Sequence, residues 1–144
     1  MLNGSIFREY DIRGVVEQDF DDAGVTLLGQ AFATKVKRMT GGSTIVLGYD
    51  GRLSSPDLEA ALIKGFKAAG AEVISIGCGP TPLLYFASYH FKAQGGLMIT
   101  GSHNPPEYNG FKMVIDQQAL FGSEIKELET LIKTNDLIID QTGG

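Results

Sequence analysis

Residues 100–112 decide how the chain folds, and they read Thr-Gly-Ser-His-Asn-Pro-Pro-Glu-Tyr-Asn-Gly-Phe-Lys. Short apolar runs at residues 96–100 and 111–115 flank it, and both are typical of buried strands. So short a connection predicts antiparallel strands, because a parallel return needs a crossover of a dozen or more residues. Ser102 therefore stands at a strand end, where ligands collect in open α/β sheets.

The same loop carries reactive side chains, namely the hydroxyl of Ser102, the imidazole of His103 and the ammonium of Lys112. Gly, Ser, Asn and Pro are ordinary turn residues, so composition alone also allows an exposed hairpin connection without chemistry. Three features favour a site. A His beside a Ser is uncommon in turns, residues 104–106 (Asn-Pro-Pro) stiffen the chain, and Asn109-Gly110 favours a sharp return towards Lys112. Such rigidity suits a preorganised site.

Outward from this loop, strand and helix patterns alternate along the chain. Apolar and β-branched runs predict the strands, and apolar residues at helical spacing predict the helices. Asp21 or Asp22 is the expected cap of the first helix, and the Ser-Pro and Thr-Pro pairs at residues 55–56 and 81–82 are expected to open the next two. The predicted strands are 12–16, 44–48, 71–77, 95–100 and 110–116, and the predicted helices are 22–39, 55–70, 81–90 and 123–133.

This alternation predicts a three-layer α/β/α domain. Its mixed, mostly parallel sheet is expected to have four strands and one antiparallel edge strand, the latter formed by residues 110–116. A chain of 144 residues supports one domain with a sizeable core. We expect residues 1–134 to form this domain and residues 135–144 to begin a linker to an absent second domain. The aromatic residues expected in the core are Phe7, Phe32, Phe66 and Phe86.

Composition narrows the class of function. A formal net charge of -5 argues against a nucleic-acid-binding surface, and the basic run at residues 35–38 is expected to complement a helix dipole. The single cysteine, Cys78, excludes an intramolecular disulfide and is expected at a strand end. Although there are 19 glycines, Pro82 stands where a G-x-G-x-x-G fingerprint starting at Gly77 needs its third glycine, and no ATPase-type phosphate loop is present.

No apolar run has the length of a signal-peptide core or of a membrane span, so we expect a cytoplasmic protein without membrane partners.

Four blocks of sequence, in this order, resemble the signatures of the α-D-phosphohexomutases, in particular the phosphomannomutase/phosphoglucomutase branch. The resemblance extends from Ile6 to about Lys133 and covers the first of the four domains of that family. The blocks are Phe-Arg-Glu-Tyr-Asp-Ile-Arg-Gly at 7–14, Gly-Tyr-Asp-Gly-Arg at 48–52, Gly-Pro-Thr-Pro at 79–82, and Thr-Gly-Ser-His-Asn-Pro at 100–105 followed by Asn-Gly-Phe-Lys at 109–112.

The resemblance implies the N-terminal domain of an isomerase that interconverts hexose 1-phosphate and hexose 6-phosphate. Ser102 would carry a phosphoryl group and donate it to the substrate, giving a hexose 1,6-bisphosphate intermediate. Lys112 and Arg13 would hold the transferring group or the reacting hydroxyl, and His103 would assist proton transfer or orient the loop. Tyr10, Arg13, His103 and Lys112 are the expected substrate-binding residues.

The resemblance also implies Mg²⁺, bridging the phosphate on Ser102 to carboxylates outside this chain. The remaining domains of a full-length enzyme would then be its partners, and the chain alone is expected to be inactive. Loops outside this chain would select the hexose, although the form of the block at 100–105 leans away from the glucosamine branch.

The residues leave alternatives open. Tyr10 and Arg13 could be exposed strand residues, His103 could hydrogen-bond only within its loop, and the Asp50-Gly51-Arg52 turn favours an internal ion pair or a loop brace. A non-catalytic sugar-phosphate-binding or interaction module is a second reading. A serine hydrolase is disfavoured, because adjacent Ser and His side chains rarely meet and no G-x-S-x-G elbow is present.

Overall fold

A computed structural model describes residues 6–7, 12–52, 54–79, 81–101, 105 and 107–139. The predicted alternation of strands and helices is confirmed, and the short elements α1 and β6 were not predicted. The elements are β1 (Ile12–Val15), α1 (Val16–Asp19), α2 (Asp22–Thr40), β2 (Thr44–Tyr49), α3 (Ser55–Ala68), β3 (Glu72–Cys78), α4 (Thr81–His90), β4 (Gly95–Ile99), β5 (Tyr108–Ile115), β6 (Gln118–Ala119) and α5 (Ser123–Lys133).

The strands form one mixed sheet in the order β1-β5-β4-β2-β3, with β6 added to β5. β2 is parallel to β3 and β4, whereas β5 is antiparallel to β4, β1 and β6. The expectation of four strands and an antiparallel edge strand is therefore wrong in two respects. Among the described residues the sheet has six strands. β5 lies inside the sheet, because β1 pairs with its outer side from Ile12↔Phe111 to Val15↔Tyr108.

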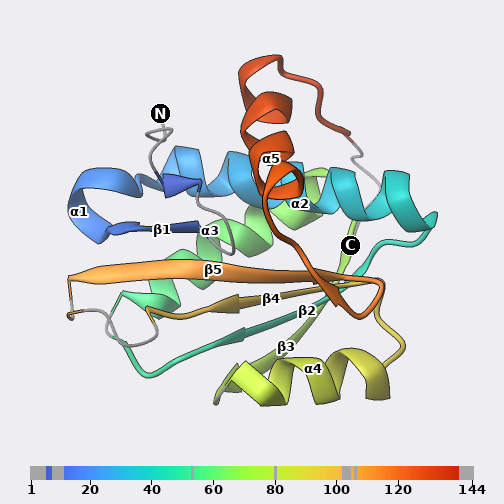
Figure 1. Ribbon diagram of the computed structural model, residues 1–144, viewed down its shortest axis with the longest axis horizontal. Coiled ribbons are helices and arrows are strands. Elements are labelled where there is room, and N and C mark those ends of the chain that lie inside the picture. Colours follow the sequence, from blue (N-terminus) through green and yellow to red (C-terminus); the bar gives the residue numbers. More distant parts are fainter. Residues whose placement is uncertain are drawn as a thin grey trace.

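The three-layer arrangement is confirmed. Helices α2, α3 and α5 lie on one face of the sheet and α4 lies on the other (Figure 1). Apolar residues on the two sides of the strands belong to two separate clusters. Leu97 and Phe111 are in the cluster that includes residues of α2, and Met98 and Val114 are in the cluster that includes residues of α4. Because successive side chains of a strand point to opposite faces of the sheet, the cluster to which one residue belongs shows which face the others point to.

Glycines bring α2 and α3 into close contact. A Cβ at Gly65 would lie 2.7 Å from the amide nitrogen of Gln30, and one at Gly29 would lie 2.7 Å from the carbonyl oxygen of Leu62. Phe32 and Phe66 fill the space beside this contact, with ring centroids 6.2 Å apart, and both are fully buried. Each ring contributes roughly 1.5–3 kcal/mol of hydrophobic stabilisation.

Helix ends follow the sequence at α2 but not at α3. The Asp21 carboxylate accepts a hydrogen bond from the amide of Gly24 at 2.8 Å, and Gly41 ends the helix with a φ of 80°. At α3 the N-cap is Ser54, and its side chain makes no cap hydrogen bond. The expected cap Ser55 is the first helical residue, and its hydroxyl donates to Asp50.

Phe7, Phe32 and Phe66 are buried as expected, but the prediction for Phe86 is wrong, since its side chain is 66% exposed. Leu84 and Ala87 are the α4 residues that pack against the sheet, and Phe86 projects from another side of this helix, where it stacks on His90. Because α4 is apolar on several sides, its sequence does not reveal which side the sheet covers.

The basic run at 35–38 does more than complement a helix dipole. Lys37 donates to the carbonyl of Gly41 in the last turn, as a dipole interaction would place it, but Lys35 is buried and pairs with Glu127 of α5 at 2.6 Å. Arg38 pairs with Asp136 beyond α5 at 2.9 Å. α5 and the segment after it are thus joined to α2 by ion pairs between helices and loops.

The segment after α5 lies against α2. Gln30 donates to the carbonyl of Ile138 at 2.8 Å, and the amide of Ile138 donates to the hydroxyl of Thr34 at 3.0 Å. Whether residues 135–144 begin a linker stays a prediction, and residues 140–144 lie outside the described part. None of the described helices has the length and apolar character that crossing a membrane requires.

Candidate functional site

The candidate site lies where the parallel strands β2, β3 and β4 end together. The amide of Asp50, just past β2, donates to the carbonyl of Ile99 at the end of β4, at 2.9 Å. The amide of Gly79, just past β3, donates to the carbonyl of Tyr49 at 2.9 Å. Cys78 lies at this edge, exposed at the end of β3 as expected. In open α/β sheets this is the edge where ligands bind.

Three of the predicted site residues, Ser102, His103 and Tyr10, lie outside the described residues. The structure does describe the chain on both sides of 102–104, at Thr100-Gly101 and at Pro105. Thr100 and Gly101 directly follow β4 at the edge described above, and Pro105 precedes β5.

Arg13 and Lys112 lie on the same face of the sheet, near the end of β4. Arg13 is paired with Gly110, and Lys112 is two residues further along β5, opposite Met98. Met98 belongs to the α4 cluster, so alternation places both cations on the α4 face. Such diagonal neighbours lie about 7–8 Å apart, within reach of long side chains.

Gly110 allows this approach of β1. The amide of Thr100 donates to the carbonyl of Gly110 at 2.8 Å on one side. On the other side a Cβ at Gly110 would lie 3.2 Å from the Cα of Arg13, and closer still to the carbonyl oxygen of Ile12. The prediction that Asn109-Gly110 forms the turn is wrong, because both residues lie within β5 and neither has a positive φ. The connection occupies the residues before Tyr108.

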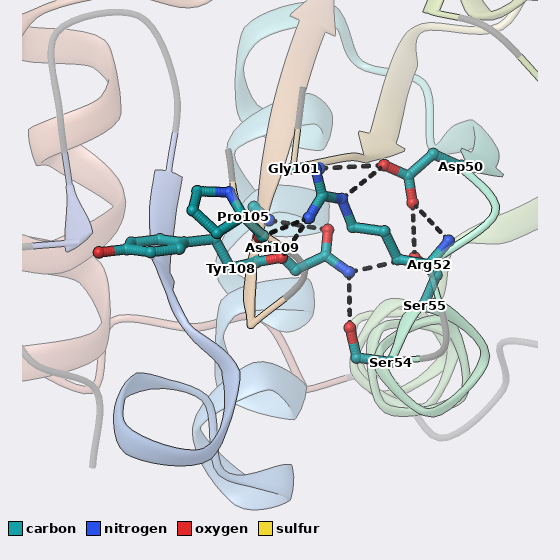
Figure 2. Close-up of polar contacts among 9 residues, drawn as sticks. Asp50, Arg52, Ser54, Ser55, Gly101, Pro105, Tyr108 and Asn109 are labelled. Carbon is teal, nitrogen blue, oxygen red and sulfur yellow. Dashed lines mark hydrogen bonds and ion pairs between the residues drawn. The ribbon is translucent and has the colours of Figure 1, made fainter. Parts of the chain in front are cut away.

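Asp50 fixes the chain immediately before residue 102. Its Oδ1 accepts from the amide of Arg52 at 3.1 Å and from the hydroxyl of Ser55 at 3.0 Å. Its Oδ2 accepts from the amide of Gly101 at 3.0 Å and from Nε of Arg52 at 3.2 Å. Figure 2 shows the carboxylate between these groups. The expected Asp50–Arg52 ion pair is thus confirmed.

Arg52 fixes the chain immediately after residue 104. Its Nη1 donates to the carbonyl of Pro105 at 2.7 Å and to the carbonyl of Tyr108 at 3.1 Å (Figure 2). The guanidinium also fills the space beside Gly101, where an added Cβ would lie 2.7 Å from Nη2 and closer to Cζ. We call Asp50 and Arg52 together the loop brace, since this ion pair holds Gly101 on one side of the loop and Pro105 on the other.

Asn109 extends the loop brace into α3. Its Nδ2 donates to the hydroxyls of Ser54 at 2.9 Å and Ser55 at 3.1 Å, while its Oδ1 accepts from the amide of Gly110 at 2.9 Å. Asn109 is fully buried. The Ser55 hydroxyl therefore accepts from Asn109 and donates to Asp50, so the network is continuous.

Sequence reasoning missed Asn109, Ser54 and Ser55 as members of this network. A signal was present, since Asn109 shares its strand face with Phe111 and Met113, both buried. A polar residue at a core-facing position must find hydrogen-bond partners, because leaving it unsatisfied costs about 1–3 kcal/mol.

The network sets the charge of Asp50. Burial alone would raise the pKa of its carboxyl, but hydrogen bonds from the amides of Arg52 and Gly101 and the hydroxyls of Ser55 and Thr100 outweigh burial and hold the pKa below its ordinary value. Asp50 is therefore ionised at neutral pH and attracts the Arg52 guanidinium.

The described residues do not by themselves form a metal site. Among them no group of three or more His, Cys, Asp or Glu side chains could hold a metal ion. The Asp50 carboxylate adjoins the loop, but both of its oxygens accept hydrogen bonds. A complete Mg²⁺ shell therefore does not fit this part of the chain.

Comparison with known proteins places the chain in a family. The family model described as phosphoglucomutase/phosphomannomutase, alpha/beta/alpha domain I, matches residues 4–138. A phosphoglucomutase of Neisseria meningitidis is 45% identical over 128 residues, which are 89% of this chain and 28% of that protein. A phosphomannomutase/phosphoglucomutase of Pseudomonas aeruginosa is 42% identical over 136 residues, or 94% of this chain and 29% of that protein.

The fold agrees with these sequences. A crystal structure of a phosphoglucomutase/phosphomannomutase family protein from Burkholderia thailandensis superposes with a TM-score of 0.89 at 40% identity, over 96% of this chain and 32% of that one. The chain thus spans less than a third of the length of these relatives. It belongs to the phosphoglucomutase/phosphomannomutase family and corresponds to the α/β/α domain I of that family.

Proposed function

We propose that this chain is the phosphoserine-bearing domain of a mutase that interconverts hexose 1-phosphate and hexose 6-phosphate. The observation that carries the proposal is the position of Arg13 and Lys112. They lie side by side on one sheet face, at the strand end from which residue 102 departs. Two cations near the end of the strand that precedes Ser102 suit phosphoryl transfer, which depends on positioning and on dispersal of negative charge.

In the proposed reaction a phosphoryl group resides on Oγ of Ser102. The phosphorus–Oγ bond breaks as a hydroxyl of the hexose phosphate attacks, a new phosphorus–oxygen bond forms to the sugar, and the proton of the attacking hydroxyl passes to Oγ of Ser102. The product is hexose 1,6-bisphosphate with an unmodified serine. After the bisphosphate turns over in the cleft, its other phosphoryl group returns to Ser102 by the reverse step, which releases the isomerised hexose phosphate.

Each site residue has a proposed part. Arg13 and Lys112 stabilise the charge on the transferring phosphoryl group, and His103 moves a proton or orients the loop. Tyr10 is a proposed substrate contact. Mg²⁺, if bound, would neutralise phosphate charge. It would require the phosphate on Ser102 together with carboxylates outside the described residues.

The activity of the whole protein, its hexose preference and a cytoplasmic location are also proposals, because the chain matches less than a third of its relatives. We expect the isolated chain to lack turnover, since the reacting groups of all domains must be held together.

Turnover of the full-length enzyme with glucose 1-phosphate and mannose 1-phosphate tests the proposal. Ser102→Ala should lower the rate by several orders of magnitude and leave the melting temperature unchanged, since it removes the covalent acceptor and a loop hydroxyl contributes little to stability. Ser123→Ala, at the start of α5, is the matched control and should retain the rate. A Ser102→Ala enzyme with the wild-type rate would show that the nucleophile lies elsewhere.

A further inference from the structure

The loop brace bonds to the chain on both sides of residues 102–104. Residues 102–104 connect Gly101 to Pro105, and both of these are bonded to one ion pair. Apolar packing that stabilises the domain lies elsewhere, in the clusters on the two faces of the sheet. The polar groups of the loop brace instead converge on the two ends of one loop.

The geometry suits control of position. Asp50 is bonded to the end of β4 through its own amide, which donates to Ile99 at 2.9 Å, and to α3 through Ser55. Arg52 is only 16% exposed and is held by the carboxylate at 3.2 Å. Its planar guanidinium can bond Asp50 and two carbonyls at once, which a lysine ammonium on a flexible stem reproduces poorly. The ends of the loop are thus tied to the rigid sheet and to α3.

We infer that Asp50 and Arg52 are positioning residues for phosphoryl transfer, which fix the backbone on both sides of Ser102 and so determine where its hydroxyl meets the substrate. This inference rests on the proposed function. The two residues act through Gly101 and Pro105 and need not touch the substrate. A displacement of about 1 Å in such an arrangement can lower a rate by on the order of 100-fold.

Gly101 offers a variant that disturbs the loop brace without removing either charged group. In Gly101→Ala the new methyl takes the place of the Arg52 guanidinium, which must then leave Pro105 or Asp50. Asp50→Asn is the second variant. In the wild type both carboxylate oxygens of Asp50 accept hydrogen bonds. In the variant an NH₂ group, which cannot accept them, replaces one of these oxygens. Glu127→Gln is the control, because it weakens the ion pair between α2 and α5, which includes no group of the loop brace.

Amide hydrogen exchange in the 144-residue chain tests the structural half of the inference. Gly101→Ala and Asp50→Asn should speed exchange at Tyr108 and in residues 100–101 by about 10-fold or more, beyond any change at Leu97 in the core of β4. Glu127→Gln should not produce this local difference. Equal changes at the loop ends and at Leu97 would mean that Asp50 and Arg52 support the fold alone, and would overturn the inference.

Steady-state kinetics of the full-length enzyme test the functional half. Both variants should lower kcat by on the order of 100-fold and change KM by less than about 3-fold, because the hydroxyl is misplaced while the sugar contacts remain. Glu127→Gln should lose stability without losing kcat. An unchanged kcat in Asp50→Asn and Gly101→Ala, in an enzyme that Ser102→Ala inactivates, would overturn the positioning role and leave the proposed function intact. An active Ser102→Ala enzyme would overturn the proposed function itself.

Discussion

Two ion pairs of this domain have similar chemistry and different surroundings. Lys35 and Glu127 join α2 to α5 at 2.6 Å, with the lysine side chain 5% and the glutamate side chain 52% exposed. Asp50 and Arg52 lie at the carboxyl edge of the sheet, and besides bonding to each other they bond to Gly101 and Pro105 on the two sides of one loop. The first pair connects packed helices. The second connects a loop to the rigid scaffold, so we expect the two to affect stability and rate differently.

The largest effect on rate in this comparison should come from Lys112, which lies on β5 opposite Met98 and is not part of the loop brace. In the full-length enzyme Lys112→Met should lose roughly 3 kcal/mol or more of transition-state stabilisation, as removal of a preorganised charge donor does. The melting temperature should barely change. The measurement is kcat/KM, with Lys133→Met on α5 as the control. If Lys112→Met keeps kcat/KM and instead unfolds at lower temperature, Lys112 is structural.

The α2–α5 pair should show the opposite behaviour. Glu127→Gln leaves the ammonium of the buried Lys35 without its carboxylate, and we expect a loss of about 1 kcal/mol in the free energy of unfolding. Denaturant unfolding of the isolated chain measures this. The kcat of the full-length enzyme should stay within error of wild type. A large drop in kcat would remove the distinction between the two regions.

Asp50 should also change how the free energy of unfolding depends on pH in the acid range. The pKa of Asp50 in the folded chain lies below the ordinary 3.8, so the unfolded chain binds more protons between these two values. The stabilisation is fully present above pH 3.8 and is lost as the pH falls through the folded pKa. Denaturant unfolding between neutral and strongly acidic pH should therefore show a shallower acid loss in Asp50→Asn than in wild type. Identical acid slopes would contradict the bonding described for the carboxylate.

The smallest effect should come from the exposed pair of Arg38 and Asp136, which are joined at 2.9 Å. Asp136→Asn should change the free energy of unfolding by less than about 0.5 kcal/mol, because solvent screens the pair. Denaturant unfolding at low and high salt measures this. A loss as large as that of Glu127→Gln would show that the segment after α5 is a structural part of the domain.

Much of the fold could be predicted from the sequence, because local signals determine it. Apolar periodicity predicted the main elements, Asp21 was one of the two expected caps of α2, and a short connection after β4 required an antiparallel β5. The family resemblance is confirmed by the domain I match.

These local signals could not predict which strands distant in the sequence pair with each other. Nothing local places the four-residue β1 against β5, and that pairing moves β5 from the edge into the sheet. Asn109-Gly110 has the composition of a hairpin turn, yet Thr100 and Arg13 pair on either side of Gly110 and keep it in a strand. Tertiary contacts override turn preference here.

The candidate site likewise has contacts that the sequence predicts and contacts that it does not. The Asp50–Arg52 pair could be expected because its members are two residues apart, whereas the bonds to Pro105 and Asn109 depend on the sheet bringing distant segments together. Arg13 and Lys112 lie on one face of the sheet near the end of β4, and their part at the loop stays a prediction. The catalytic roles of Ser102, His103 and Tyr10 stay predictions, as these residues lie outside the described part.

Peptide mass mapping of the full-length enzyme after exposure to glucose 1,6-bisphosphate tests the central claim most directly. We predict one phosphate, located on Ser102 and lost when glucose 1-phosphate is added in excess and the bisphosphate removed. We further predict that Gly101→Ala acquires it much more slowly, while Glu127→Gln acquires it at the wild-type rate. Phosphate on another residue, or none at all in an active enzyme, would contradict the assignment of Ser102 as the phosphoryl carrier.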